Sequence, residues 1–269
     1  MKIDNWLKEA KNQLEIAGIA TARLDALVLL EDALGIGRAQ ILARPETELS
    51  SDVQNVLEAQ LQRRIGHEPL AYIRGKAEFY GREFIVGPGV LVPRPESEAI
   101  IELLLKHELP SSPVIADVGT GSGALGITAK LEMPEAIVEL LDIDKAALAI
   151  AKQNADKYSL DVQVLQSDLL TNGSRYHDVL LCNLPYVPEL FKINKAATHE
   201  PPVALFGGMD GLSLYRQLFK ELSQSRNKPS LILTESLPKQ HEALTAIAKK
   251  SGYAQTVEQD FIQAFTLKD

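Results

Sequence analysis

Cysteine, long apolar runs and basic residues are all scarce in this sequence of 269 residues. The one cysteine, Cys182, excludes an internal disulfide and is typical of a protein in a reducing compartment. The longest apolar runs have the length of a strand and fall short of the roughly 20 residues that a membrane-spanning helix needs. Residues 1–20 are amphipathic and lack the apolar centre of a signal peptide. We therefore expect a cytoplasmic protein without a membrane partner.

The charge balance is acidic, with 28 lysines and arginines against 36 aspartates and glutamates and a net charge of −8. A protein with a large nucleic-acid footprint usually carries a basic excess, so we expect no stable binding to nucleic acid. The five histidines are scattered without the spacing of metal ligands, and we expect no metal site. The remaining composition is that of an ordinary globular protein, 45% hydrophobic and 24% charged.

The first part of the chain is patterned as helices. One apolar stripe at helical spacing runs between Asp4, a candidate N-cap, and Gly18, which is placed to end the helix. A second stripe stops near Gly35, and a third begins at Ser51 or Asp52. This spacing leaves two functions open: a module that docks a partner, or a bundle that stabilises the rest of the chain.

From Gly75 onward the pattern changes to strands. Phe79–Val86 reads as a hairpin, and a helix is expected after Pro95. Strand-like and helix-like segments then alternate, which predicts an α/β fold with a mostly parallel sheet and a ligand site at the strands' carboxyl ends. The expected strands are Val114–Val118, Ile137–Asp142, Asp161–Leu165, Asp178–Cys182 and Ser230–Glu235, and the expected helices between them are Lys145–Tyr158 and Leu212–Ser225.

The stretch DVGTGSGALG, residues 117–126, is a glycine-rich turn between a strand and a helix. Glycines there let a ligand approach the backbone without a Cβ in the way. Asp142 ends the next strand, where a carboxylate can accept hydrogen bonds from two ribose hydroxyls. From Gly121 onward the stretch also fits the dinucleotide fingerprint G-x-G-x-x-G, which leaves a dehydrogenase open.

The glycines, however, begin immediately after Asp117-Val118, and this G-x-G-x-G resembles motif I of methyltransferases that use S-adenosylmethionine. The resemblance implies that the loop lies against the methionine and ribose parts of that cofactor, through Gly119, Thr120, Gly121, Ser122 and Gly123. It also implies that Asp168 and Leu169, which follow the third strand, lie near the adenine ring.

The end of the fourth strand carries the sequence NLPY, which resembles the [N/D/S]-x-P-[Y/F] motif of methyltransferases that modify planar nitrogens. A delocalised nitrogen lone pair is a weak nucleophile, so the reaction needs acceptors that hold the N–H bonds and stabilise growing positive charge. We expect the side-chain oxygen of Asn183 and the backbone carbonyl of Leu184 to be these acceptors. Pro185 would stiffen the corner, and Tyr186 would pack against the flat target group. These four are the expected catalytic and substrate-binding residues, and Asn183 would also border the cofactor.

Beyond these motifs, the chain resembles the HemK/PrmC family, whose members methylate a glutamine of peptide chain release factors. The resemblance rests on four stretches: residues 22–35, 63–98, 117–127 and 200–218. It implies a helical substrate-docking domain (residues 1–74), a β-hairpin linker (75–92) and a seven-stranded Rossmann-like class I methyltransferase domain (93–269). It also implies S-adenosylmethionine as cofactor, release factors as partners and N5-methylation of the glutamine in their Gly-Gly-Gln loop; we expect the enzyme to be a monomer.

The sequence departs from the family pattern at a few positions. Leu184 replaces a proline, Ser97 stands where the family has threonine, and Ser236-Leu237 follows Glu235 in place of a usual Ile-Gly. The change after Glu235, and the altered segment near the C-terminus, are expected to lie away from the methyl-transfer site. Because NLPY with leucine also resembles adenine dimethyltransferases, adenine-N6 methylation of RNA or DNA remains the alternative.

Overall fold

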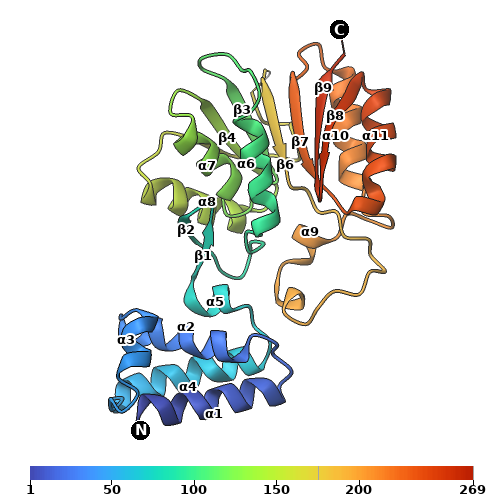
Figure 1. Cartoon of the computed structure of the whole chain (residues 1–269). Coiled ribbons are helices and arrows are strands. Elements are labelled where there is room, and N and C mark those ends of the chain that lie inside the picture. The colour runs from blue at the N-terminus through green and yellow to red at the C-terminus, as the bar shows by residue number, and fades with distance from the viewer. Residues whose placement is uncertain (175, 269) are drawn as a thin grey trace. The chain divides into compact units, whose positions relative to one another are not determined.

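A computed structural model describes residues 1–174 and 176–268. Figure 1 follows the chain from the blue helices near the N-terminus to the red strands near the C-terminus. The chain forms two compact units. Unit 1 consists of Met1–Lys76 together with Asn194–His199, and unit 2 consists of Ala77–Ile193 with Glu200–Asp269. Each unit is described by itself below.

Unit 1 is a small helical bundle around its own apolar core (Figure 1). The three helices expected from apolar spacing are confirmed, and two short helices were not anticipated because they are too short to show a period. The bundle comprises α1 (Ile3–Ile16), α2 (Ala22–Leu34), α3 (Arg38–Ala43), α4 (Ser51–Ile65) and α5 (Leu70–Arg74).

The residues that cap the helices of unit 1 differ in part from those expected from the sequence. Lys2, not Asp4, occupies the N-cap of α1, and Asp4 lies in the first turn, where it pairs with Lys8. The N-cap of α4 is Ser50, whose hydroxyl accepts a hydrogen bond from the Val53 backbone N–H at 3.4 Å. Gly35 ends α2 in the left-handed conformation, as expected.

Unit 2 contains a seven-stranded sheet in the order β5-β4-β3-β6-β7-β9-β8. The first five of these strands run parallel to their neighbours, and β9 pairs antiparallel with both β7 and β8. The five predicted strands are confirmed, although β5 starts two positions late. The strands are β3 (Val114–Val118), β4 (Ile137–Asp142), β5 (Gln163–Gln166), β6 (Val179–Cys182), β7 (Leu231–Glu235), β8 (Tyr253–Gln259) and β9 (Ile262–Leu267).

Helices cover both faces of this sheet, as the alternation of elements predicts. One apolar core contains side chains of α6 (Glu98–Leu104), α7 (Ala124–Glu132) and α8 (Lys145–Lys157). A second core contains those of α10 (Ser213–Gln224) and α11 (His241–Lys250), and α9 (Pro202–Leu205) is a single short turn. None of the helices in the described part of the chain is long and apolar enough to cross a membrane.

The hairpin begins earlier than predicted, with β1 (Lys76–Phe79) and β2 (Arg82–Ile85). Tyr80 and Gly81 both have positive φ at its tip, which suits a tight two-residue turn. The side chain of Asn154, on α8, accepts a hydrogen bond from the Ile85 N–H and donates to the carbonyl oxygens of Ile85 and Ser122. The hairpin is thereby tied to the glycine-rich loop after β3.

Candidate active site

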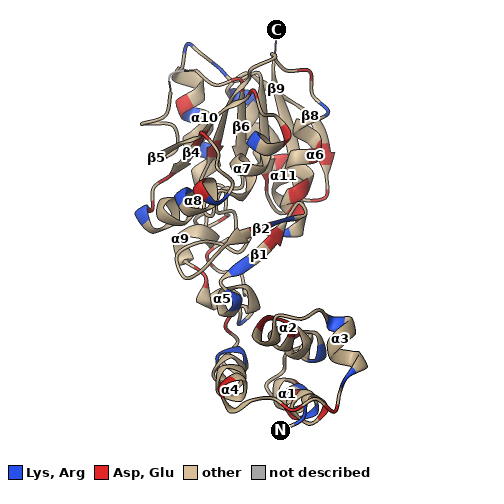
Figure 2. Ribbon diagram, turned by 90° about the vertical axis from the view of Figure 1, so that its left-hand side faces the viewer, with Lys and Arg blue, Asp and Glu red and all other residues tan. Residues whose placement is uncertain are grey.

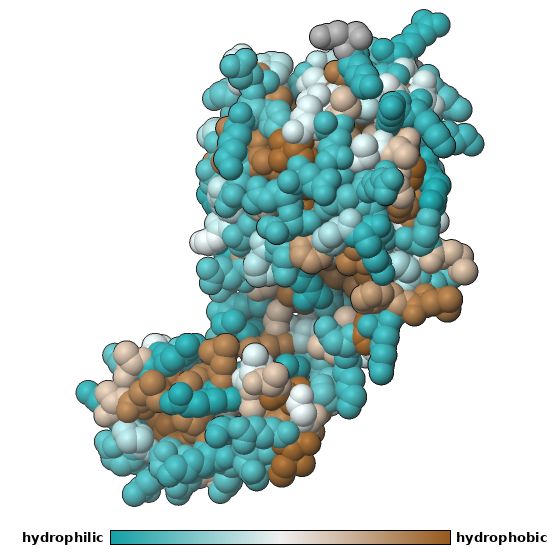
Figure 3. All heavy atoms as spheres, turned by 45° about the vertical axis from the view of Figure 1, so that its right-hand side comes forward, coloured by the Kyte–Doolittle hydropathy of each residue, from teal (hydrophilic) through white to brown (hydrophobic). Residues whose placement is uncertain are grey.

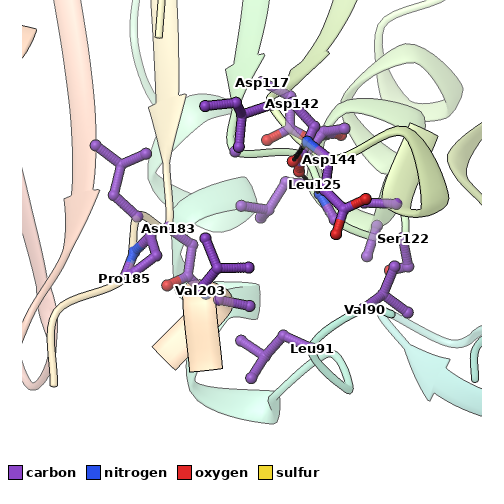
Figure 4. A pocket seen from close by; sticks show the side chains of 18 of the residues that line it. Val90, Leu91, Asp117, Ser122, Leu125, Asp142, Asp144, Asn183, Pro185 and Val203 are labelled. Carbon is purple, nitrogen blue, oxygen red and sulfur yellow. Dashed lines mark hydrogen bonds between the residues drawn. The ribbon is translucent and has the colours of Figure 1, made fainter. Parts of the chain in front are cut away.

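A pocket of about 1120 Å³, including its open mouth, lies at the carboxyl ends of the parallel strands. The residues that line it include Asp117 of β3 and the loop after that strand, Asp142 at the end of β4, Asp168 after β5 and Asn183 after β6. Figure 4 shows Asn183 and Pro185 on one side of the pocket and Asp142 and Asp144 on the other. The strand order therefore brings together residues that the sequence keeps far apart.

The glycine-rich loop is fixed from inside the sheet by Asp117. This buried carboxylate accepts hydrogen bonds from the Thr120 hydroxyl at 2.6 Å and from the Gly126 N–H at 2.8 Å. Burial raises the pKa of Asp117 to about 6 in spite of these two donors. Gly119 and Gly121 have φ of 72° and 55°, the left-handed conformation that glycine adopts without strain.

Asp142 is half-buried and has the acceptor capacity that a ribose requires. One of its oxygens accepts from the Gly121 N–H and the other from the Asp144 N–H, each at 2.9 Å. An ionised carboxylate offers about four acceptor sites, so two remain for a pair of hydroxyl groups. Burial raises the pKa of Asp142, while these backbone donors oppose that rise. The residues present fit the ribose of an adenosine-containing cofactor.

The neighbouring wall is suited to an aromatic base. Ile143, which sequence reasoning missed, lines the pocket although 54% of its surface is exposed. Leu169 and Asp168 also line the pocket, and the Ser167 hydroxyl donates to the Leu169 carbonyl at 2.8 Å. An exposed isoleucine directly after the strand-end acid was a signal available in the sequence. Two apolar side chains beside a carboxylate can hold a flat ring with polar edges.

The NLPY corner borders the pocket and holds two acceptors that have no donor among the described residues. The Asn183 Nδ2 donates to the Ser97 Oγ at 2.9 Å, and the Asn183 Oδ1 accepts no hydrogen bond from any residue that the structure describes. The Leu184 carbonyl likewise has no donor among the described residues. Both predicted acceptors therefore remain available to a ligand that lies against Asn183 and Leu184.

Leu184 contributes its side chain to the pocket in addition to its carbonyl. Its side chain is buried and lines the pocket, and a Cβ added at Gly119 would lie 3.1 Å from the Leu184 Cδ2. The leucine thus covers the first turn of the glycine-rich loop. The missing β-carbon of Gly119 leaves the space that this larger side chain occupies.

Behind the corner lies Glu235, the last residue of β7, which sequence reasoning missed. Its buried carboxylate accepts hydrogen bonds from the Ser97 hydroxyl at 2.5 Å and from the Tyr186 hydroxyl at 2.8 Å. Burial raises the pKa of Glu235, and the two hydroxyl donors oppose the rise. The changed residues that follow it, Ser236 and Leu237, do not line the pocket. Glu235 itself contacts Tyr186 of the corner and Ser97, so the end of β7 supports the site.

A second glycine-rich segment, Gly207–Gly211, supports the corner from outside. A Cβ at Gly207 would overlap the Pro185 carbonyl oxygen, and one at Gly211 would overlap the Tyr186 carbonyl oxygen. The Gln240 Nε2 donates to the Tyr186 carbonyl at 2.8 Å and to that of Asp210 at 2.7 Å. The backbone of the corner is thus packed against another backbone with no side chain between them.

An ion pair closes a further wall of the pocket. The Arg94 guanidinium donates to the buried Glu200 carboxylate at 2.5 Å, and the Val92 N–H donates to the same carboxylate at 3.2 Å. This contact joins the segment that carries Leu91 to the segment that carries Val203, and both of these residues line the pocket (Figure 4). The role of Arg94 and Glu200 could not be found from sequence, since they are 106 positions apart.

Most of the residues expected at the site do line the pocket. They are Gly119, Thr120, Gly121, Ser122, Asp142, Asp168, Leu169, Asn183, Leu184 and Pro185. Gly123 and Tyr186 are not among the lining residues: Gly123 forms the N-cap of α7, and the Tyr186 hydroxyl bonds to Glu235. In the described part of the chain, His, Cys, Asp and Glu side chains form no group of three or more that could hold a metal ion.

Comparisons with known proteins agree with this arrangement along the chain. A family model described as PrmC N-terminal domain matches residues 5–75, and one described as Methyltransferase small domain matches residues 95–200. The chain is 31% identical to the release factor glutamine methyltransferase of Deinococcus radiodurans, over 97% of this chain and 95% of that protein. It is 38% identical to the protein of the same name from Koribacter versatilis, over 81% and 80%.

Solved structures of low sequence identity share the fold. A methyltransferase from Pyrococcus furiosus matches with a TM-score of 0.52 and 17% identity, over 80% of this chain and 96% of that one. The expected seven-stranded class I methyltransferase fold is thereby confirmed.

Proposed function

The chain belongs to the family of release factor glutamine methyltransferases, and we propose that it methylates the side-chain amide nitrogen (N5) of the glutamine in the Gly-Gly-Gln loop of peptide chain release factors. The observation that carries the proposal is the side-chain oxygen of Asn183, which has no partner among the described residues and lies across the pocket from Asp142 (Figure 4). Asn183 lies on the side of the pocket that would hold the substrate nitrogen, and Asp142 lies on the side that would hold the ribose of the cofactor.

The enzymes of this family use S-adenosylmethionine, which supplies an activated methyl group when it is bound. In this chain Asp142 would accept the two ribose hydroxyls through the acceptor sites that Gly121 and Asp144 leave open. Ile143, Asp168 and Leu169 would hold the adenine ring. The fixed glycine-rich loop would let the rest of the cofactor approach the backbone.

The corner would act on the glutamine amide by orientation and charge. The Asn183 Oδ1 and the Leu184 carbonyl would each accept one N–H of the amide, which aims the nitrogen at the methyl group. As positive charge grows on the nitrogen, both hydrogen bonds become charge-assisted, so they strengthen in the transition state. A hydrogen bond to a charged group contributes about 1.5–3 kcal/mol, which gives each acceptor a measurable share of the rate.

A protein substrate also fits the surface of unit 2 near the pocket. Leu190, Phe191, Val203 and Met209 are exposed large apolar residues of the segment that follows the corner, and Val203 also lines the pocket. Figure 3 shows apolar side chains gathered at the lower edge of unit 2. Exposed apolar groups of this kind mark protein contacts. On the face of unit 2 that Figure 2 shows, basic and acidic residues are interspersed, which differs from the basic face typical of a nucleic-acid-binding protein. Both features favour a protein over a nucleic acid.

The division of labour along the chain is part of the proposal. Residues 1–74 would dock the release factor, residues 75–92 would link the two parts through the hairpin, and residues 93–269 would carry out methyl transfer. The match of residues 5–75 to the PrmC N-terminal domain supports the first assignment. The enzyme would act as a cytoplasmic monomer, without a stable nucleic-acid partner.

The test is incubation of the chain with methyl-labelled S-adenosylmethionine and either intact release factor or ribosomal RNA. Mass spectrometry should locate the label on the glutamine of the Gly-Gly-Gln loop, and replacing that glutamine should abolish labelling of the release factor. A matched control is the same release factor heat-denatured, which separates docking from recognition of the loop alone. Label on RNA adenine with the release factor untouched would refute the proposed substrate.

A further inference from the structure

The orientation of the Asn183 carboxamide decides whether the corner can work at all. The two ends of an asparagine side chain have nearly the same shape, but one accepts hydrogen bonds and the other donates them. With Nδ2 turned into the pocket, two donors would face the N–H bonds of the substrate nitrogen. Something in the protein must therefore fix which end of Asn183 faces the pocket.

The hydrogen-bond chain behind the corner has a single consistent direction. An ionised carboxylate only accepts, so the one hydrogen of the Ser97 hydroxyl is committed to the Glu235 carboxylate, 2.5 Å away. The Ser97 oxygen is left as an acceptor, and it takes the Asn183 Nδ2–H at 2.9 Å. In the flipped amide, the Asn183 Oδ1 would face the Ser97 oxygen with no hydrogen between them.

The other oxygen of Glu235 is held as well, since it accepts the Tyr186 hydroxyl at 2.8 Å. The Tyr215 hydroxyl lies 2.6 Å from the Glu235 carbonyl oxygen and 2.9 Å from that of Cys182, which joins the ends of β7 and β6. Glu235 and Ser97 are only 1% and 3% exposed, so water does not compete for these bonds. The carboxylate is thereby fixed in place and in direction.

The usual role of a serine at this position does not explain Ser97. Ser97 is the N-cap residue of α6, where a serine hydroxyl commonly accepts a backbone N–H of the first helical turn. Here the side chain makes no such capping bond. Its hydroxyl is used across the fold instead, toward residues 86 and 138 positions away.

We infer that Ser97 and Glu235 are positioning residues that hold the Asn183 carboxamide with its oxygen toward the substrate nitrogen. This inference rests on the proposed function, because it assigns to the pair the orientation that methylation of an N–H-bearing nitrogen needs. It selects substrates whose nitrogen carries hydrogens to donate. Glu235 is not among the residues that line the pocket, and Ser97, which does line it, is assigned a role through the Asn183 amide.

The experiment compares steady-state methylation of the release factor by the parent chain and by three variants. Ser97→Ala removes the hydroxyl that connects Glu235 to Asn183. Ser97→Thr keeps a hydroxyl at this position, and Ser236→Ala is the matched control. Ser236 adjoins Glu235, and its buried hydroxyl makes no hydrogen bond to any described residue. Cofactor affinity and the unfolding midpoint are measured for each variant.

Ser97→Ala should lower kcat about ten- to a hundredfold, the range that a hydrogen bond to a charged group commands, with cofactor affinity and unfolding midpoint close to those of the parent. Ser97→Thr should restore kcat to within about threefold, and Ser236→Ala should leave it unchanged. Should Ser97→Ala fail to fold, Glu235→Gln is assayed with the same expectation, because its amide can donate to Ser97 and reverse the chain.

Three results would overturn the inference: parental kcat in Ser97→Ala, an equal loss in Ser236→Ala, or no recovery in Ser97→Thr. In each of these cases the parent still methylates the release factor and the proposed function stands. If the parent itself does not label the loop glutamine, the proposed function fails, whatever the variants do. The two failures are therefore distinguishable.

Discussion

At the scale of single residues, the pocket is defined by oxygen atoms whose hydrogen-bonding capacity is only partly used. Asp142 uses two of its acceptor sites for backbone N–H groups, and Asn183 donates one of its two amide N–H bonds to Ser97 and leaves its oxygen without a donor among the described residues. The first leaves acceptors for hydroxyl groups, and the second leaves an acceptor for an N–H bond. These two requirements together describe a ribose-containing cofactor and a nitrogen substrate.

Replacing Asp142 tests the ribose-holding side. Asp142→Ala should weaken S-adenosylmethionine binding by roughly 2–4 kcal/mol, because two charge-assisted hydrogen bonds are lost. The raised pKa of Asp142 adds a pH dependence: the carboxylate is protonated at a higher pH than an ordinary aspartate, so affinity should fall on acidification. Calorimetry across a pH series measures both effects.

Asp142→Asn is the control for this prediction, since it keeps the shape and cannot titrate. The affinity of Asp142→Asn for S-adenosylmethionine should be reduced and nearly independent of pH over the interval in which the parent loses affinity. In the same calorimetric assay, NAD should not bind the parent chain. Unchanged affinity in Asp142→Ala would show that the ribose is held elsewhere.

What the sequence could reveal at this scale depends on distance along the chain. The glycine-rich loop, Asp142 and the NLPY corner were predictable because each is a short contiguous pattern at the end of a strand. Ser97, Glu235 and Glu200 were not, because their partners lie 49 to 138 positions away. Contacts of that kind are set by the order of strands in the sheet.

At the scale of elements, the catalytic corner depends on a loop with no catalytic group of its own. The segment Gly207–Gly211 packs its backbone against the carbonyl oxygens of Pro185 and Tyr186. The Val187 carbonyl accepts the Gly207 N–H at 3.0 Å, which holds the loop to the segment after the corner. The family resemblance of this stretch thus has a physical cause: side chains at these glycines would displace the corner.

Two glycine-to-alanine substitutions, at Gly211 and at Gly18, distinguish the steric overlap of an added Cβ with the corner from the strain of a left-handed backbone. Gly211 and Gly18 both have a φ of 81°, but a Cβ at Gly18 meets nothing within 4 Å. Gly18→Ala should cost only the left-handed strain, about 1–2 kcal/mol of unfolding free energy. Gly211→Ala should cost about 3–5 kcal/mol, because a Cβ there overlaps the Tyr186 carbonyl and the Gln240 side chain.

Denaturant unfolding of the two variants measures the difference. Equal losses of unfolding free energy in Gly211→Ala and Gly18→Ala would show that the loop adapts and does not support the corner. If the loop does brace the corner, methyl transfer should also fall in Gly211→Ala, and it should be retained in Gly18→Ala.

The elements themselves were predicted to different degrees. The parallel strands are short, buried apolar runs bounded by turn residues, and their positions were found almost to the residue. The pairing of β8 and β9 and the helix α11 were not assigned from the pattern. β8 exposes much of its length and lacks a clean alternation, so its sequence resembles a loop.

At the scale of the whole molecule, two compact units share one chain in a way that the sequence does not reveal. Residues Asn194–His199 belong to unit 1, although the residues on both sides belong to unit 2. In unit 1 the His199 Nε2 lies 3.0 Å from the Gly66 carbonyl oxygen. The chain that leaves the NLPY corner therefore visits the other unit before it returns to Glu200, and no local pattern predicts such a crossing.

The central claim is that Asn183 holds the substrate nitrogen and stabilises its growing charge. The most direct measurement is the single-turnover rate of methyl transfer to the release factor for Asn183→Ala at saturating S-adenosylmethionine, together with its cofactor affinity. The rate should fall by roughly two to three orders of magnitude, as when other transition-state hydrogen bonds are removed, while cofactor affinity should change only a few-fold. A rate within a few-fold of the parent, or a loss explained entirely by weaker cofactor binding, would contradict this role for Asn183.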